Sequence, residues 1–242
     1  MTAYRERHYR RQVRHERLVP FEVAVQETDL LILAETDLAV LAEEVIYKVR
    51  GPLEGYIAQH PEFLRAMTPL PQDEFAPPMV KEMLNAALKC GTGPMAAVAG
   101  AIAEQVGLAL LQESREVVVE NGGDCFVKVD SPLRVSILAG RSQLSKSLAL
   151  RVLPERKGLG ICTSSGTVGH SLSLGKADAV TVIAPSAALA DAAATMICNQ
   201  VQSESDIQRA LTFAQKIEKV RGVIIIIGEH LGAWGEVELV PS

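Results

Sequence analysis

The chain has few aromatic residues, which make up 4% of its 242 residues. Proteins that bind single-stranded nucleic acid stack bases on aromatic side chains, so this scarcity argues against such a surface. An excess of positive charge is missing as well, because the formal net charge is -5. An acidic chain has no general affinity for polyanions, and the composition therefore argues against nucleic-acid binding.

Long apolar runs are also lacking. A run such as Val223 to Ile227 is far too short to span a bilayer. The charged N-terminal segment lacks the apolar centre and the small-residue cleavage site of a signal peptide. We therefore expect a cytoplasmic protein without membrane contact.

Cysteine pairs are absent from the sequence, since Cys90, Cys125, Cys162 and Cys198 lie far apart. No two of them have the spacing of metal ligands or of a redox pair. We expect reduced and mostly buried thiols. Hydrophobic residues make up 48% of the chain and charged residues 22%, a composition typical of one large or two modest globular domains.

Positive charge is concentrated at the N-terminus. The first 18 residues include Arg5, Arg7, Arg10, Arg11, Arg14 and Arg17. Such an arm could contact nucleic acid or an anionic membrane. We favour the alternative that it forms a solvated edge strand or pairs with an acidic patch on the same protein.

In the first half of the chain, strand patterns precede helix patterns. We expect a hairpin over residues 21–35, a helix over 38–49 capped by Thr36 and stopped at Gly51-Pro52, and helices over 79–89 and 95–112. Five prolines between residues 60 and 78 predict a connection with little regular structure. A hairpin around residues 121–124, joined by a strand over 134–140, should end this half.

The second half repeats the order of strands, helices and strands, beginning with paired strands over 148–154 and 159–165. A strand over 177–185, helices over 187–198 and 204–219, and strands over 222–228 and 234–240 complete the pattern. This order favours the α+β class, with antiparallel sheets covered on one face by paired helices.

Asp191 and Thr195 lie four residues apart on an alanine-rich predicted helix, so their oxygens share one face. Hard oxygen ligands suit Mg²⁺, which usually brings phosphates with it. The alternative is a solvated Asp on the outer helix face and a Thr bonded to its own backbone. Spacing alone favours that alternative.

Three loops could bind an anion. Residues 91–94 combine glycines with a helix start, although a plain helix entry has the same pattern. Residues 121–124 form an Asn-Gly turn, which hairpins use without any function. Residues 163–170 place hydroxyls and glycines after a strand, where they could wrap a phosphate or a flavin edge. His170 in this loop could relay protons, but an isolated histidine is more often a surface residue.

No nucleophile elbow surrounds Ser164 or Ser165, so a hydrolase triad is not indicated.

Taken in order, these segments resemble the ApbE-like family, whose best-known members are FAD:protein FMN transferases. ADAAATM at 190–196 is similar to the family's A-D-A-x-x-T metal motif, and VTVIAPSA before it resembles the V-T-V-x-A strand. ENGGDCFV at 120–127 is similar to the N-x-G-G-D-I hairpin, and ICTSSG at 161–166 to the A-T-S-G segment. PMAAVAGAIAEQVG at 94–107 resembles the helix written G-x-I-A-K-G-Y-A-x-D.

The resemblance implies a tandem pair of ββααββ units, the T-fold. It implies a single domain over residues 1–242, built of two similar halves at approximately 1–140 and 141–242. By resemblance, Mg²⁺ would be held by Asp191, Thr195 and the backbone carbonyl near Val98, and His170 and Asp191 would be catalytic. The implied flavin-binding residues are Asn121, Gly122, Gly123, Asp124, Thr163, Ser164, Ser165 and Gly166.

The activity implied by the resemblance is transfer of FMN from FAD to a Thr or Ser of an acceptor protein, with release of AMP. The sequence departs from the family pattern in having Ala99 in place of Lys and Glu104 in place of Asp. It also has a shortened loop that keeps His170 and Asp178. The shorter pattern resembles the UPF0280 subgroup.

These departures keep two functions open. Intact Asp191 and Thr195 favour a Mg²⁺-dependent flavin transferase, whereas the missing Lys and loop residues favour a non-catalytic protein that binds a flavin, a nucleotide or a small anion. The sequence leaves both a monomer and a homodimer open.

Overall fold

A central antiparallel sheet of eight strands organises the fold. The computed structural model describes residues 10, 17–140, 142–145, 147–167 and 174–242. Within them the sheet has the order β1-β2-β3-β4-β7-β8-β9-β10. Its strands are β1 (Val19–Val25), β2 (Thr28–Ala34), β3 (Val117–Asn121), β4 (Asp124–Lys128), β7 (Leu159–Ser164), β8 (Ala179–Ala184), β9 (Gly222–Ile227) and β10 (His230–Gly235).

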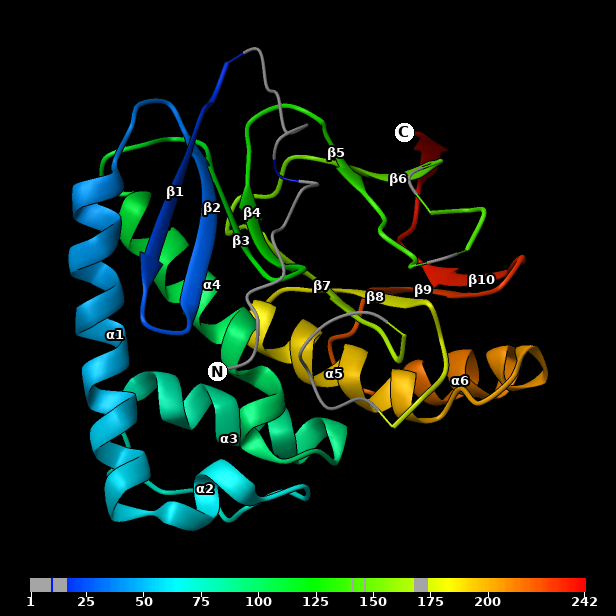
Figure 1. The fold of residues 1–242 in the computed structure, drawn as a ribbon, viewed down its shortest axis with the longest axis horizontal. Coiled ribbons are helices and arrows are strands. Elements are labelled where there is room, and N and C mark those ends of the chain that lie inside the picture. Colours follow the sequence, from blue (N-terminus) through cyan, green and yellow to red (C-terminus); the bar gives the residue numbers. More distant parts are fainter. Residues whose placement is uncertain (1–9, 11–16, 141, 146, 168–173) are drawn as a thin grey trace.

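Helices cover one face of this sheet, and a small second sheet packs on the other (Figure 1). The helical elements are α1 (Ala39–Gln59), α2 (Pro61–Arg65), α3 (Pro78–Cys90), η2 (Pro94–Ala97), α4 (Val98–Leu110), α5 (Ala187–Asn199), η3 (Glu204–Asp206) and α6 (Ile207–Ala214). The small sheet has the order β11-β6-β5, with β5 (Leu133–Ser136), β6 (Leu148–Val152) and β11 (Leu239–Pro241).

The sheet separates two hydrophobic cores because successive side chains of a strand point to opposite faces. In β2, Leu30 and Ile32 belong to the core under the helices, whereas Leu31 and Leu33 belong to the core under the small sheet. Both faces of β2 are therefore buried. This burial explains why its sequence is a continuous apolar run rather than an alternating one.

The α+β class and the antiparallel sheets predicted from the sequence are confirmed. Along the chain, the pair β1–β2 leads through helices to β3–β4, and the pair β7–β8 leads through helices to β9–β10. Figure 1 shows α1 beside β1 and β2 at one end of the molecule and α6 near β9 and β10 at the other. The interpretation as two related units, with halves at 1–140 and 141–242, stays a prediction.

Three strand predictions are wrong. The strand expected over 134–140 does not join the 121–124 hairpin, because β5 pairs with β6 in the small sheet. The strands over 148–154 and 159–165 are not partners, since β7 pairs with β4 and β8. The strand expected over 234–240 is split between the two sheets, because Gly235 turns the chain with a φ of 85°. Propensity identifies strands but does not select their partners.

The helix predictions need smaller corrections. α1 does not stop at Gly51-Pro52 but runs to Gln59 with Pro52 inside it. The proline removes one hydrogen bond, while Leu53 continues the buried face of the helix. Thr36 does not cap α1, since the Asp37 carboxylate accepts from the Ala39 amide at 2.9 Å. The predicted helices 95–112 and 204–219 begin as the short helices η2 and η3 and end earlier, at Leu110 and Ala214.

The proline-rich segment is mostly irregular, as predicted. Its exception is α2, a single short helix that Pro61 begins. Gly93 packs against this segment so closely that a Cβ atom there would lie 1.7 Å from the Ala66 carbonyl oxygen. The segment is therefore fixed next to the start of η2.

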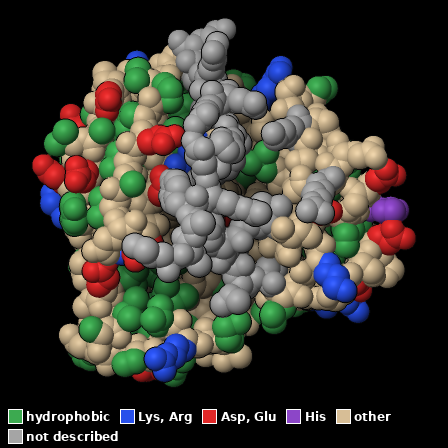
Figure 2. Space-filling view, in the orientation of Figure 1, with side chains coloured by type: hydrophobic (Ala, Val, Ile, Leu, Met, Phe, Trp, Pro, Cys, Tyr) green, Lys and Arg blue, Asp and Glu red, His purple; other side chains and the backbone are tan. Residues whose placement is uncertain are grey.

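The N-terminal arm contributes a buried cation. Arg10 is 5% exposed and forms salt bridges with Asp29 and Glu120, each at 2.7 Å. Arg17 pairs with Glu116 at 3.2 Å. For these two residues the expected acidic patch on the same protein is confirmed, and the alternative of a solvated strand is wrong for Arg10. Figure 2 shows the described Lys and Arg side chains of one face scattered among acidic ones.

All four cysteines are free and buried, as the sequence predicts. Burial raises the pKa of the Cys90 thiol to about 12, and it also raises the pKa of Cys125 and Cys162. Because only the thiolate reacts, we expect these thiols in the folded protein to react with Ellman's reagent at least about a hundredfold more slowly than in urea. One thiol that reacts at the unfolded rate without urea would contradict this arrangement.

No single helix in the described ranges is long and apolar enough to cross a membrane. The segments Pro78–Cys90 and Pro94–Leu110 pass that test only as a pair, and they are bent by 105° at their junction. Their buried side chains, among them Met83 and Ile102, belong to the core under the helices.

Candidate functional site

The turn between β3 and β4 brings together four of the predicted site residues. Asn121 ends β3 and Asp124 begins β4, and the two residues are paired across the hairpin. Gly122 and Gly123 lie between them with φ angles of 71° and 108°, which favour glycine. Asn121 and Asp124 are both buried, so the two ends of this turn lie against the rest of the protein, whereas Gly122 at its tip is exposed.

Asp191 projects from α5 toward the start of α4. Its carboxylate accepts a hydrogen bond from the Gly100 amide at 2.9 Å, and the Ala99 amide also bonds to it. The side chain is buried, with the residue 8% exposed. The alternative of a solvated Asp on the outer face of the helix is therefore wrong.

The hairpin contacts the same turn of α4. The Asn121 side-chain amide donates to the Ala99 carbonyl oxygen at 3.1 Å. The Ala99 carbonyl oxygen thus accepts from Asn121, and the Ala99 amide donates to Asp191. Val98, whose carbonyl the resemblance implicates, is the first residue of α4 and lies in this turn.

The end of β7 lies beside the hairpin. Asp124 is opposite Cys162 in the sheet, and the Thr163 amide donates to the Gly123 carbonyl at 3.2 Å. Strand alternation places Ser164 on the helix-covered face with Asp124 and Asn121. The Ser164 hydroxyl is buried and has no hydrogen-bond partner within the described part of the chain.

Thr163 points to the other face of the sheet, where its hydroxyl lies 2.9 Å from the Thr181 hydroxyl. Its backbone, rather than its side chain, contacts the hairpin turn. The following residues, Ser165 and Gly166, leave the strand, and the Gly166 amide donates to the Ala177 carbonyl at 2.9 Å. This bond closes the base of the loop that carries the predicted His170, which lies outside the described residues.

Thr195 lies one turn beyond Asp191 on α5 and is half-buried. Its neighbour Met196 approaches Gly91, where a Cβ atom would lie 3.4 Å from the methionine methyl group. This part of α5 therefore lies near the loop that joins α3 to η2.

Two buried acidic side chains, Asp124 and Asp191, are close enough to interact electrostatically. Burial raises the pKa of Asp124, and the charges of Asp191 and Glu120 raise it further. Burial also raises the pKa of Asp191, opposed by the hydrogen bonds from Gly100 and Ala99. No Lys or Arg among the described residues offsets either carboxylate. A bound cation would remove this electrostatic cost.

The side chains fit a magnesium ion better than a softer metal. Carboxylate oxygens of Asp191 and Asp124, the Thr195 hydroxyl and a backbone carbonyl are all hard ligands. The described residues contain no cluster of three or more His, Cys, Asp or Glu side chains that could enclose a metal. A metal here would keep open positions for water or phosphate oxygens, as Mg²⁺ commonly does.

Sequence reasoning missed three contributors to this region. Thr92, within the predicted 91–94 loop, has a buried hydroxyl with no partner among the described residues. Glu104, noted only as a departure from a family pattern, binds the start of α5. Glu120 accepts from the Gly123 amide at 2.8 Å and holds the hairpin turn. Its place directly before the Asn-Gly turn was the available signal.

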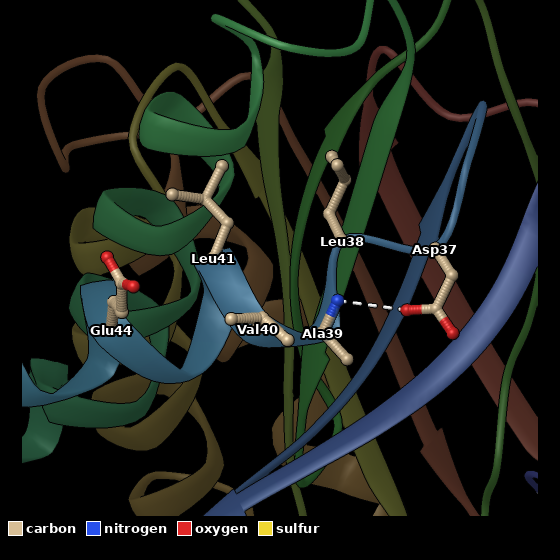
Figure 3. Close-up of a pocket in the computed structure, with 6 residues that line it drawn as sticks. All are labelled: Asp37, Leu38, Ala39, Val40, Leu41 and Glu44. Carbon is tan, nitrogen blue, oxygen red and sulfur yellow. Dashed lines mark hydrogen bonds between the residues drawn. The ribbon is translucent and has the colours of Figure 1, made fainter.

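Figure 3 shows a pocket at the start of α1. Val40 in its lining is 75% exposed, and Asp37 is engaged with the Ala39 amide. The pocket contains none of the predicted site residues, and its lining consists of Asp37, Leu38, Ala39, Val40, Leu41 and Glu44.

Comparison with known proteins places the chain in a family. Residues 10–231 match the family model described as "AbpE bacteria". A UPF0280 protein of Methanococcus maripaludis is 40% identical over 222 residues, which cover 89% of this chain and 90% of the relative. The chain belongs to the UPF0280 family. A second UPF0280 protein, from Methanocaldococcus jannaschii, is 39% identical over 91% of this chain and 92% of its own length.

Solved structures connect the UPF0280 fold with that of ApbE proteins. The apo form of the flavinyl transferase ApbE from Pseudomonas stutzeri superposes with a TM-score of 0.56 at 14% identity, covering 90% of this chain and 94% of that one. A variant of the flavin transferase ApbE from Vibrio cholerae gives 0.57 at 13% identity, covering 90% and 97%. At this identity the likeness shows the fold alone, and it confirms the ApbE-like fold predicted from the sequence.

Proposed function

We propose that this UPF0280 protein is a Mg²⁺-dependent flavin transferase that moves FMN from FAD to a Thr or Ser hydroxyl of an acceptor protein. The observation that carries the proposal is the placement of two buried carboxylates near the start of α4. Asp191 accepts from the Gly100 amide there, and Asp124 is paired with Asn121, whose side chain bonds to the same turn of α4. An ApbE-like fold around this pair supports a flavin nucleotide as the ligand.

Each part of the site has a role in this proposal. Asp191 and Thr195 would hold the metal with the carbonyl near Val98, and Mg²⁺ would supply charge neutralisation at the pyrophosphate. The hairpin turn 121–124 and the residues Ser164 to Gly166 would bind and orient the flavin nucleotide. His170, in the loop after β7, would accept the proton of the attacking hydroxyl.

The reaction balances without a further reactant. The acceptor hydroxyl oxygen forms a bond to the phosphorus on the riboflavin side of FAD, and the bond from that phosphorus to the AMP oxygen breaks. AMP leaves, and the hydroxyl proton is released to the base. Positioning of the hydroxyl and stabilisation of phosphate charge supply the rate enhancement in such a transfer.

We expect purified protein, incubated with FAD, Mg²⁺ and candidate acceptor proteins, to release AMP and to add the mass of FMN to one acceptor. Omitting Mg²⁺ should abolish both signals. Tight binding of FAD without AMP release from any acceptor would instead select the non-catalytic flavin-binding function. If FAD does not bind at all, both functions fail.

Asp191→Asn should weaken Mg²⁺-dependent FAD binding by about ten- to a hundredfold, because the amide keeps one acceptor oxygen for Gly100 but loses the charge that attracts the metal. Isothermal titration with FAD, with and without Mg²⁺, measures this change. Asp37→Asn, at an exposed carboxylate just before α1, is the matched control and should bind like the wild type. Equal affinities for the Asp191 variant and the wild type would contradict the metal assignment.

A further inference from the structure

Helices α4 and α5 each carry an acidic side chain that binds the start of the other. Asp191 of α5 accepts from the Gly100 amide of α4 at 2.9 Å. In return, Glu104 of α4 accepts from the Ala187 amide of α5 at 2.7 Å and from the Ser186 hydroxyl at 2.9 Å. The first backbone amides of a helix have no acceptor within the helix, and the helix dipole is positive at this end. Both effects favour a carboxylate at the start of α4 and at the start of α5.

The charge of Glu104 is directed at α5 rather than at a basic residue. Burial raises its pKa, while the hydrogen bonds from Ser186, Ala187 and Ala188 lower it, and no Lys or Arg within the described ranges contributes. Ser186 already caps α5 by accepting from the Leu189 amide. Because Ser186 already caps α5, the bonds to Glu104 serve to connect α4 with α5 rather than to supply a missing cap.

The backbone around Ala187 is packed so tightly that a displacement at the start of α5 would be passed on to Asp191. A Cβ atom at Gly100 would lie 2.2 Å from the Ala187 carbonyl oxygen, and one at Gly160 would lie 2.3 Å from the Ala187 Cα atom. Ala187 is thus fixed by α4 on one side and by β7 on the other. One helical turn separates it from Asp191, so a shift at the start of α5 moves the Asp191 carboxylate.

We propose that Glu104 is a positioning residue, which fixes the start of α5 and thereby holds Asp191 against the amides of Ala99 and Gly100. The consequence for ligand binding rests on the proposed function, because Asp191 and Thr195 are the proposed metal-binding residues. The position of Asp191 itself does not depend on that function.

Two variants test the proposal. Glu104→Leu removes the contact, and Glu104→Gln keeps one acceptor oxygen without the charge. Glu82→Gln is the matched control, because Glu82 on α3 bonds to Gln105 of α4 at 2.9 Å, and no hydrogen bond joins it to α5 among the described residues. Ile46→Val in the buried part of α1 controls for a general loss of stability.

The first measurement is hydrogen exchange at the amides of Ala99 and Gly100, which needs no ligand. We expect Glu104→Leu to lower the protection of these amides about tenfold or more, Glu104→Gln to lower it less, and both controls to leave it unchanged. If Glu104→Leu does not fold, the near-isosteric Gln variant decides. Unchanged protection in a folded Glu104 variant overturns the proposal.

The second measurement is the affinity for FAD in the presence of Mg²⁺. Loss of the positioning residue should weaken it about tenfold, whereas a loss of stability alone, as in Ile46→Val, should not move it. Altered protection together with a wild type that binds no FAD would support the position of Asp191 and overturn the proposed function instead. Wild-type FAD affinity in a variant with lost protection overturns the claimed link between Glu104 and ligand binding.

Discussion

Replacing Arg10 with Met is expected to lower the free energy of unfolding by about 3–5 kcal/mol, the usual cost of removing one partner from a buried ion pair. Arg10 bonds to Glu120 and Asp29, and all three side chains are buried. Methionine fills most of the vacated volume but removes the Arg10 guanidinium from both buried carboxylates. Urea unfolding, followed by circular dichroism, measures the change.

Two further variants separate the burial of charge from the loss of a side chain. Arg151→Met breaks an exposed pair with Glu238 and should cost less than about 1 kcal/mol. Adding Asp29→Asn and Glu120→Gln to Arg10→Met removes the two buried negative charges that Arg10 had bonded, and it should restore part of the lost stability. A cost for Arg10→Met as small as that for Arg151→Met would show that the Arg10 network adds nothing beyond a surface pair.

The Arg10 network also bears on the site, because Glu120 holds the hairpin turn through the Gly123 amide. Arg10 and Asp29 lie with Glu120 on the face of the sheet opposite the helices, whereas Asn121 and Asp124 face α4 and α5. The 121–124 turn therefore links the Arg10 network on one face of the sheet with the candidate site on the other. A chain segment that sequence analysis treated as a basic arm thus fixes a residue next to the proposed flavin-binding turn.

Local patterns predicted those elements whose partners are close in sequence. The β3–β4 hairpin follows from β-branched runs on either side of an Asn-Gly turn, and α5 follows from its alanine-rich pattern. The positions of β5 and β6 depend on the apolar face of a sheet formed by distant strands. Nothing in either strand's own sequence distinguishes pairing within the small sheet from pairing with β4.

The site could be predicted in part for the same reason. Spacing placed Asp191 and Thr195 on one side of a helix, but it could not tell whether that side faced solvent or α4. The order of the motifs along the chain supported the family resemblance. The resemblance in turn implied that Asp191 and the 121–124 turn belong to the same site. Charge pairing across the fold, such as Arg10 with Glu120 or Glu104 with α5, leaves no pattern in a single sequence.

Close approach of α4 and α5 depends on Gly100, so Gly100→Ala is expected to destabilise the protein. The new methyl group would lie 2.2 Å from the Ala187 carbonyl oxygen and 2.9 Å from the Asp191 Cβ atom. Backbone atoms cannot move aside as a flexible side chain can, so the strain should reach about 3 kcal/mol. Alanine recovers about 1 kcal/mol through its helix propensity, which leaves a net loss of about 2 kcal/mol.

Gly55→Ala provides the opposite case within the same protein. Gly55 also lies inside a helix, but nothing approaches its Cβ position within 4 Å. There the propensity gain is unopposed, and we expect the protein to become more stable by up to about 1 kcal/mol. Urea unfolding of both variants should therefore give changes of opposite sign, and a stabilising Gly100→Ala would show that α4 and α5 can separate without cost. Because the same separation moves Asp191 away from the Gly100 amide, Gly100→Ala should also weaken FAD binding with Mg²⁺, whereas Gly55→Ala should leave it unchanged.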